Sequence, residues 1–327
     1  MIFNKKIAVI YTGEVRTIEK TIKYLKKNVL LHENVHVFAV LQSNNIGYYD
    51  NFVKNNIGTH LKSLEWFHPN NDDWLQIREQ LLDPMSVSNE WKSYLKNSGS
   101  MIEYYQMFLA YQEIKKREYE KGYSYDYILR IRCDVILTHP IYFDWDDCSI
   151  DNIKDYLYQI KKHLQSESIL CYDVLQYFMN TFYHKDRLFC KTLTFDNYAV
   201  SDEFRQLLEI EVSNENEFIE KVYSYFKKGK YIITLRSNQI YFIKRQYFEN
   251  ISKIGITYGN QHIMPNNNYW FNSESQIKQI CLENNVDIFD STTLLEGQSL
   301  YEYNENNYFE NGELKQTYDC LFFIKRI

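Results

Sequence analysis

The sequence predicts an α/β fold, with a Rossmann-type sheet, helices on both faces and a mixed C-terminal region. Short apolar runs alternate with amphipathic helical stretches over the first 140 residues, a pattern typical of parallel strands joined by crossover helices. Strand and helix patterns mix less regularly after that point. Hydrophobic residues make up 45% of the 327 residues and there are only 4 prolines, so we expect one compact domain over residues 1–327, with a domain boundary near residues 145–150 as the alternative.

The N-terminal elements follow from their hydrophobic patterns. Residues 6–11 form a short apolar run that ends at Thr12-Gly13, as a buried parallel strand would. Apolar side chains recur on one helical stripe over residues 17–31, which predicts an amphipathic helix. Residues 35–41 and 61–67 are apolar enough to be the second and third strands.

A long helix is predicted over residues 100–121, followed by the strongest strand signal of the chain. The helix is apolar nearly all round in its first half, which predicts that this half is buried. Gly122 ends the helix, and residues 125–137 form the strand. In the later half we expect helices over 151–165, 215–228 and 273–284, strands and turns over 231–258, and short strands at 193–200, 286–289 and 321–324.

Charge and composition exclude several classes. A net charge of −6 and no long basic segment argue against a nucleic-acid binder. No apolar run approaches the ~20 residues of a membrane helix, so we expect no membrane span. Six cysteines without a CxxC pair predict reduced thiols in a cytoplasmic protein. The abundance of Tyr and Phe and the scarcity of Gly and Pro indicate an AT-rich source, either a large DNA virus or an AT-rich microbe. A viral source would place the protein in the host cytoplasm.

Three charged residues on one face of the strand at 125–137 are the most informative feature. Side chains alternate along a strand, so Arg130, Arg132 and Asp134 share one face. Unpaired burial of such charges costs several kcal/mol per ion, so they either form a structural ion-pair network or face a ligand cleft. Arg132 and Asp134 lie about 6–7 Å apart along a strand. We expect this spacing to suit one polyanion and its metal ion better than mutual contact.

Two further segments are candidate sites. Residues 12–16 lie between the first strand and the first helix, where backbone N–H groups can bind an anion; an ordinary turn is the alternative. Asp144-Trp145-Asp146 matches the DxD pattern of a metal-binding site, and the alternative interpretation is a surface turn or a helix cap. Neither a P-loop nor a GxGxxG turn occurs at residues 12–16.

The segment YDYILRIRCD (125–134) resembles the corresponding "YDY, two hydrophobic residues, R-x-R-x-D" segment of a group of GT-A-fold glycosyltransferases. Three other pieces are similar to parts of these proteins: IAVIYTGEVR (7–16), SMIEYYQ (100–106), and NSESQI (272–277) with VDIF (286–289). The resemblance covers residues 6–140 well and the rest loosely. It implies a GT-A-like fold, with a nucleotide-sugar-binding half over 1–145 and an acceptor-binding half over 146–327.

The resemblance also implies a reaction, in which a sugar moves from a nucleoside-diphosphate sugar, a UDP-sugar as first guess, to an acceptor hydroxyl on a glycan or small molecule. Mn²⁺ or Mg²⁺ would neutralise the leaving diphosphate. Asp134 would hold the metal and serve catalysis, His262 would be a second metal ligand, and Asp202 would be the base at the acceptor. The alternatives are a structural role for His262 and a helix N-cap role for Asp202 before residues 203–211. The implied donor-binding residues are Thr12, Gly13, Glu14, Arg16, Tyr105, Arg130 and Arg132.

One departure from the family pattern leaves alternatives open. The position of the first carboxylate of a DxD is occupied by Arg132, so the arginines could take over much of the role of the metal. A nucleotidyltransferase of the same fold is a second interpretation, although residues 13–16 contain a single glycine instead of a glycine-rich loop. A catalytically inactive nucleotide-sugar-binding protein is the third.

Overall fold

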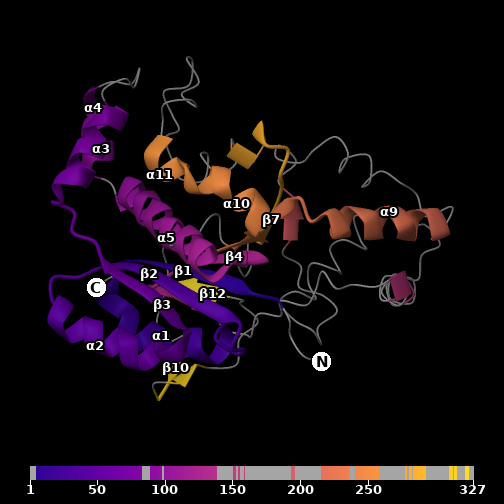
Figure 1. The fold of residues 1–327 in the computed structure, drawn as a ribbon, viewed down its shortest axis with the longest axis horizontal. Helices are drawn as coiled ribbons and strands as arrows, with labels where there is room; N and C mark the ends of the chain where they lie inside the picture. The colour runs from indigo at the N-terminus through magenta and orange to yellow at the C-terminus, as the bar shows by residue number, and fades with distance from the viewer. Residues whose placement is uncertain are drawn as a thin grey trace.

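The fold is an α/β arrangement around one mixed sheet, with helices on both of its faces (Figure 1). The computed structural model describes residues 5–82, 89–97, 99–137, 150, 151, 154, 158, 193–195, 215–235, 240–257, 277, 280, 281, 283–291, 309–311, 313, 314 and 321–323. The predicted α/β class is therefore confirmed.

The N-terminal half alternates strands and helices as predicted. Its elements are β1 (Ile7–Glu14), the 3₁₀ turn η1 (Val15–Thr17), α1 (Ile18–Asn28), β2 (Val35–Gln42), α2 (Ile46–Ile57), η2 (Gly58–His60), β3 (Leu61–Trp66), α3 (Asp72–Leu82), α4 (Asn89–Asn97), α5 (Gly99–Lys121), β4 (Tyr127–Arg132) and β5 (Val135–Leu137). The predicted strands at 6–11, 35–41 and 61–67 and the helices at 17–31 and 100–121 are confirmed within a few residues.

The described elements of the later half are shorter. They are β6 (Leu193–Phe195), α9 (Glu215–Lys228), β7 (Tyr231–Leu235), β8 (Ile240–Lys244), α10 (Arg245–Ser252), α11 (Ile254–Thr257), β9 (Asp287–Ser291), β10 (Phe309–Glu310), β11 (Glu313–Leu314) and β12 (Leu321–Phe323). Helix α9 begins and ends at the predicted residues. Residues 277, 280, 281 and 283 are also helical, within the helix predicted over 273–284.

The main sheet has eight strands in the order β3-β2-β1-β4-β8-β7-β9-β6. Strands β3, β2, β1 and β4 are mutually parallel, and this half of the sheet has the Rossmann-type order 3-2-1-4. Strand β8 runs antiparallel to both β4 and β7, which makes the sheet mixed from there on. Strands from both halves of the chain thus join one sheet.

The two faces of the sheet carry different helices. Helix α5, together with α10 and α11, lies on one face, while α1 and α2 lie on the other (Figure 1). The even-numbered side chains Ala8, Ile10, Phe38 and Ile128 pack in the same core as the buried residues of α5. This helix is therefore buried nearly all round in its first half, as its sequence predicts.

Two predictions about elements were wrong. The strand expected over 125–137 is broken at Cys133-Asp134, and β5 leaves the main sheet to pair antiparallel with β12. The region 231–258 is strand only as far as Lys244; α10 and α11 follow because Phe248, Ile251 and Ile254 lie at helical spacing and are buried. Helices α2, α3 and α4 had no counterpart in the sequence-based prediction.

Candidate functional site

The carboxyl ends of β1 and β4 form a topological switch point. From β1 the chain passes through α1 to β2 on one side, whereas β4 lies on the other side of β1. In open α/β sheets, ligands bind in the crevice outside the strand ends at such a point. The predicted site segments meet here, because Thr12 on β1 pairs directly with Arg132 on β4.

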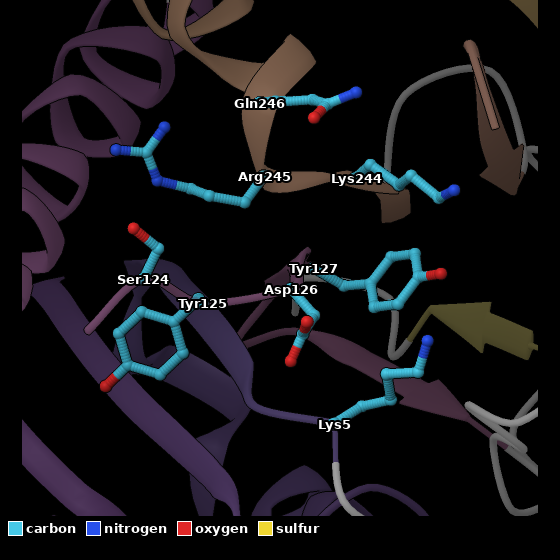
Figure 2. Close-up of a pocket in the computed structure, with 8 residues that line it drawn as sticks. All are labelled: Lys5, Ser124, Tyr125, Asp126, Tyr127, Lys244, Arg245 and Gln246. Carbon is cyan, nitrogen blue, oxygen red and sulfur yellow. The ribbon is translucent and has the colours of Figure 1, made fainter. Parts of the chain in front are cut away.

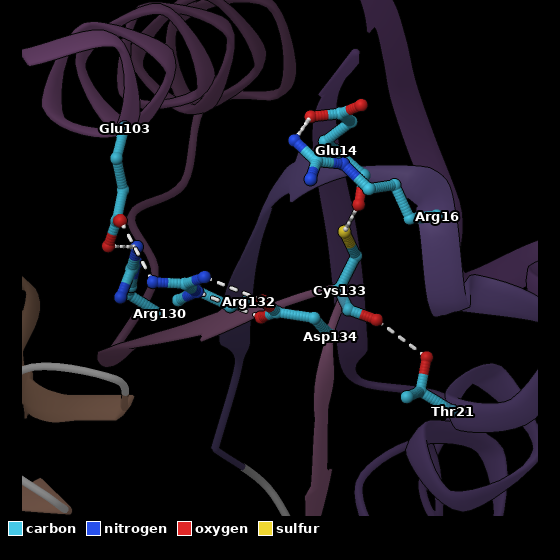
Figure 3. Close-up of polar contacts among 8 residues, drawn as sticks. All are labelled: Glu14, Arg16, Thr21, Glu103, Arg130, Arg132, Cys133 and Asp134. Atoms are coloured by element: carbon cyan, nitrogen blue, oxygen red, sulfur yellow. Dashed lines mark hydrogen bonds and ion pairs between the residues drawn. The ribbon is translucent and has the colours of Figure 1, made fainter. Parts of the chain in front are cut away.

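A four-residue ion-pair network occupies this end of the sheet (Figure 3). Glu103, in the first turns of α5, accepts a hydrogen bond from Arg130 through one carboxylate oxygen and from Arg132 through the other, the latter at 3.1 Å. Arg132 also binds Asp134 with two parallel bonds, Nε to Oδ1 at 2.8 Å and Nη2 to Oδ2 at 2.6 Å. Two positive and two negative charges therefore balance.

Burial explains why Arg130 needs a carboxylate partner. The side chain of Arg130 is only 1% exposed, and its guanidinium lies 5.3 Å from the ring centroid of Tyr241 on the neighbouring strand β8. A guanidinium in such a place needs a carboxylate partner, since an unpaired buried charge costs several kcal/mol. Glu103 supplies that carboxylate from the helix that covers this face of the sheet.

The expected separation of Arg132 and Asp134 was wrong. The strand ends at Arg132, and the turn at Cys133-Asp134 brings the carboxylate back onto the guanidinium in a bidentate pair. The spacing of 6–7 Å would have required a continuous strand. Of the two interpretations that the sequence allowed, the described residues are arranged as an ion-pair network.

The turn that carries Asp134 is fixed by contacts to β1 and α1. The backbone N–H of Cys133 donates to the carbonyl of Thr12 at 2.8 Å, and the hydroxyl of Thr21 donates to the carbonyl of Cys133 at 2.6 Å. Gly13 has a φ of +124°, and a Cβ there would lie 3.0 Å from the Sγ of Cys133. Glycine at this position therefore lets the two strand ends approach each other closely.

Glu14 and Arg16 form the solvent-facing rim of the site. They make an ion pair with each other just after β1, and the side chain of Arg16 is 50% exposed. The strand runs further than predicted, so Thr12, Gly13 and Glu14 lie on β1, and only Val15–Thr17 form the turn before α1. Arg16 is thus an accessible cation at the candidate site.

The local charges shift the pKa values of two groups. Burial opposes the charge on Arg132, but Glu103 and Asp134 raise its pKa above the ordinary value, so it stays positively charged. Burial, with the nearby charge of Asp134, raises the pKa of the Cys133 thiol well above its usual range. Cys133 is consequently a buried thiol and not an activated nucleophile.

Two other predicted donor residues are buried. The side chain of Tyr105 packs in an aromatic cluster, with its ring centroid 5.0 Å from that of Trp74 and 6.0 Å from that of Phe67. Tyr105 is therefore explained as a core residue.

Thr12 is fully buried, and its hydroxyl has no hydrogen-bond partner among the residues that the structure describes. An orphaned buried hydroxyl at a strand end requires an explanation.

Several predicted residues lie outside the described part of the chain. They are Asp202, His262 and the aspartates of the DxD at 144–146. Within the described ranges, no group of three or more His, Cys, Asp or Glu side chains is placed to hold a metal. Both carboxylate oxygens of Asp134 accept hydrogen bonds from Arg132, so its role as a metal ligand stays a prediction.

Glu103 is the site residue that sequence reasoning missed. Its signal was present, because it is a carboxylate in the first turns of a helix half that is otherwise largely apolar. A buried arginine on an adjacent strand requires such a partner.

In the described part of the chain, no helix has the length and apolar character needed to cross a bilayer. No protein-family model matches the chain, and no curated protein sequence matches it.

Proposed function

We propose that this chain is a GT-A-like glycosyltransferase that binds a nucleoside-diphosphate sugar at the carboxyl ends of β1 and β4 and transfers the sugar to an acceptor hydroxyl. The observation that carries the proposal is the position of Arg16, Arg132 and Asp134 at the switch point of a Rossmann-type half-sheet. The R-x-R-x-D resemblance supplies the reaction class.

The rim arginine is suited to contact the donor diphosphate. Arg16 is half-exposed and paired only at the surface, with Glu14, so a diphosphate can replace that carboxylate as its partner at little cost. Its position two residues after Glu14 places it at the start of the first crossover, next to the N-terminal turn of α1. Backbone N–H groups at such a helix start favour an anion as well.

The buried residues of the site then have separate roles. The orphaned hydroxyl of Thr12 can bind a donor group that reaches the strand end. Glu103 and Arg130 hold Arg132 in place beneath the site, so that its guanidinium is preorganised. Asp134 contributes to donor binding through Arg132, which it orients with two hydrogen bonds. Asp202 remains the predicted base at the acceptor.

A second function is favoured by the pairing of Asp134. Because Arg132 binds both of its oxygens, the one carboxylate of the R-x-R-x-D segment is committed to an arginine. This arrangement favours a catalytically inactive protein that binds a nucleotide-sugar without transferring it. An enzyme hydrolyses or transfers the sugar of the bound donor over a long incubation, whereas such a binding protein leaves the donor intact.

A thermal-shift screen tests the proposal. UDP-, GDP- and TDP-sugars, each with and without Mn²⁺, should include one that raises the unfolding midpoint, because a ligand bound only to the folded state stabilises it. Arg16→Ala should abolish that shift without lowering the midpoint of the free protein. Arg78→Ala, which removes an arginine paired with its neighbour Glu79 on α3, is the matched control and should keep the shift. No shift with any nucleotide-sugar would refute the proposal.

A further inference from the structure

Basic side chains gather at the amino edge of the sheet, at the opposite end of the strands from the proposed donor site. Lys6 precedes β1, His36 is the second residue of β2, Lys62 is the second residue of β3, and Arg117 lies near the end of α5. Strands β1, β2 and β3 are parallel, so their amino ends share this edge. His36 pairs with Ala8, which packs in the core beneath α5, and it therefore lies on the face that α5 covers.

A β-bulge places Lys62 in this group. Between the pairs Val37–Leu61 and Phe38–Ser63, β3 has one residue more than β2, and that extra residue is Lys62. A bulge interrupts the regular alternation of side chains and redirects the residue that it carries. The ammonium of Lys62 is thus brought within range of the positive charge of an arginine on α5.

In the part of the chain that the structure describes, neither Lys62 nor Arg117 forms an ion pair with a carboxylate. Nζ of Lys62 donates to the carbonyl of Thr59 at 2.5 Å. Burial lowers the pKa of Lys62, and the charge of Arg117 lowers it further. Arg117 interacts with the neutral hydroxyls of Tyr123 and Tyr125. Since a partly buried charge without a counter-charge is costly, an anion bound here stabilises both cations.

The nearby carboxylates have partners of their own. Glu118 pairs with Arg245 at 2.7 Å, and Asp126 accepts the backbone N–H of Lys6 at 2.7 Å. The ammonium of Lys6 lies over the ring of Tyr123, 4.9 Å from its centroid. A third positive charge therefore adds to those of the lysine on β3 and the arginine on α5.

A chain of hydrogen bonds fixes the imidazole of His36. The hydroxyl of Tyr123 donates to the hydroxyl of Tyr125 at 3.1 Å, and that hydroxyl lies 2.7 Å from Nδ1 of His36. Because the oxygen of Tyr125 accepts from Tyr123, its own proton is directed to Nδ1. The neutral imidazole then carries its proton on Nε2, which becomes a hydrogen-bond donor.

The same surroundings keep His36 neutral in the free protein. Burial, together with the positive charges of Lys62, Arg117, His60 and Lys6, lowers its pKa from 6.5 to about 4. The groups that shift its pKa are thus all basic. They come from β3, α5, η2 and the residue before β1, so the imidazole is surrounded by positive charge from several elements.

The cluster adjoins a pocket of about 460 Å³ at the same edge (Figure 2). Lys5, Asp126 and Lys244 are among the residues that line this pocket, and so is Tyr125. Figure 2 shows the ring of Tyr125 pointing away from Lys5 and Lys244. The hydroxyl that binds His36 therefore lies on the side of Tyr125 that is turned away from these lysines.

From these contacts we propose that the cluster binds a phosphate group through Nζ of Lys62 and Nε2–H of His36, while Arg117 and Lys6 contribute positive charge. A phosphate supplies the negative charge that the cluster lacks and several oxygens that accept hydrogen bonds, and lysine binds it as a point charge. The phosphate is either free or carried by a small molecule as a monoester. The site is separate from the proposed donor site, which lies at the carboxyl ends of the strands.

Calorimetry at pH 7 measures the binding of inorganic phosphate and of glycerol 3-phosphate, with sodium chloride matched for ionic strength. We expect Lys62→Gln to weaken phosphate binding about tenfold, as the loss of one charge contact near the protein surface does. Lys62→Arg keeps the charge and should weaken binding less than about threefold. Tighter binding of glycerol 3-phosphate identifies a monoester as the ligand, and equal or weaker binding identifies free phosphate.

The imidazole of His36 gives a second measurement, by NMR titration. An anion at Nε2 stabilises the protonated ring, so saturating phosphate should raise the pKa of His36 from about 4 by about one pH unit. The exposed His68 should titrate alike with and without phosphate.

Two controls locate the binding. Lys54→Gln removes an exposed lysine of α2 that pairs with Asp50, and it should leave phosphate binding unchanged. Arg16→Ala tests whether phosphate binds at the opposite edge, and it should also leave the affinity unchanged. The proposal is overturned if phosphate does not bind, if Lys62→Gln binds like the wild type, if Arg16→Ala abolishes binding, or if phosphate leaves the titration of His36 unchanged.

Discussion

Glu103 holds two arginines that come from one strand. It forms an ion pair with the almost fully buried Arg130, and it shares Arg132 with Asp134. Removal of one member of a buried ion pair is costly because the remaining charge stays desolvated. The stability of the network therefore depends on a residue that the strand sequence does not contain.

We expect Glu103→Gln to lower the free energy of unfolding by about 3 kcal/mol, since it breaks an ion pair of the almost fully buried Arg130. The measurement is equilibrium unfolding in urea. Glu113→Gln, on the same helix but in an exposed pair with Lys116 at 3.8 Å, is the matched control and should change stability by less than about 0.5 kcal/mol. Equal effects of the two substitutions would show that the network is not stabilising.

His36 gives the protein a predictable response to acid. Burial, with nearby positive charges, lowers its pKa from 6.5 to about 4 in the folded state. Between these values the unfolded chain binds a proton that the folded protein does not, so stability present above pH 6.5 is lost as the pH falls toward 4. His36 is half-buried, and after screening by solvent the loss is about 1 kcal/mol.

His36→Gln should remove this part of the pH dependence, which thermal unfolding at pH 7 and pH 5 measures. His68→Gln, at an exposed position, should keep the wild-type dependence. An unchanged pH dependence in His36→Gln would show that other groups cause the loss.

At the scale of elements, one glycine allows α11 to pack on α5. A Cβ on Gly255 would lie 2.4 Å from the carbonyl oxygen of Tyr104 and 2.8 Å from the Cβ of Phe108. Since backbone cannot move aside as a side chain can, Gly255→Ala should separate the two helices and destabilise the fold by about 1–3 kcal/mol. Chemical denaturation measures this loss.

Gly47→Ala provides the contrast. Gly47 lies in α2, and a Cβ there would meet nothing within 4 Å, so alanine should stabilise the protein by about 0.5 kcal/mol through its helix propensity. If both alanine variants were equally stable, close packing of α11 on α5 would not be important.

The sequence predicted elements well where the pattern was strong and local. Strands β1 and β2 are continuous apolar runs, and α1 has a clear amphipathic stripe, so each was located within a few residues. Helices α10 and α11 were missed because aromatic and β-branched residues favour strands by composition, whereas their burial at helical spacing depends on the contact with α5.

The candidate site was predicted in part. The shared face of Arg130 and Arg132 follows from strand alternation alone. The pairing of Arg132 with Asp134 depends on the turn at Cys133, which contacts with Thr12 and Thr21 fix from distant parts of the sequence. Such contacts are tertiary and leave no local pattern.

At the scale of the whole molecule, the two edges of the sheet differ in chemistry. The carboxyl edge carries the ion-pair network and the half-exposed Arg16, whereas the pocket lined by Lys5, Asp126 and Lys244 lies at the amino edge. The proposed donor site therefore lies at the carboxyl ends of β1 and β4, away from this pocket.

Hydrogen exchange of the wild-type protein, with and without a saturating nucleotide-sugar, tests the central claim most directly. Binding at the switch point predicts slower exchange of backbone amides in the segments 12–17 and 132–134, with 124–127 and 244–246 unchanged. Protection confined to the latter segments, or no protection of 12–17 and 132–134, would contradict the assignment of the donor site.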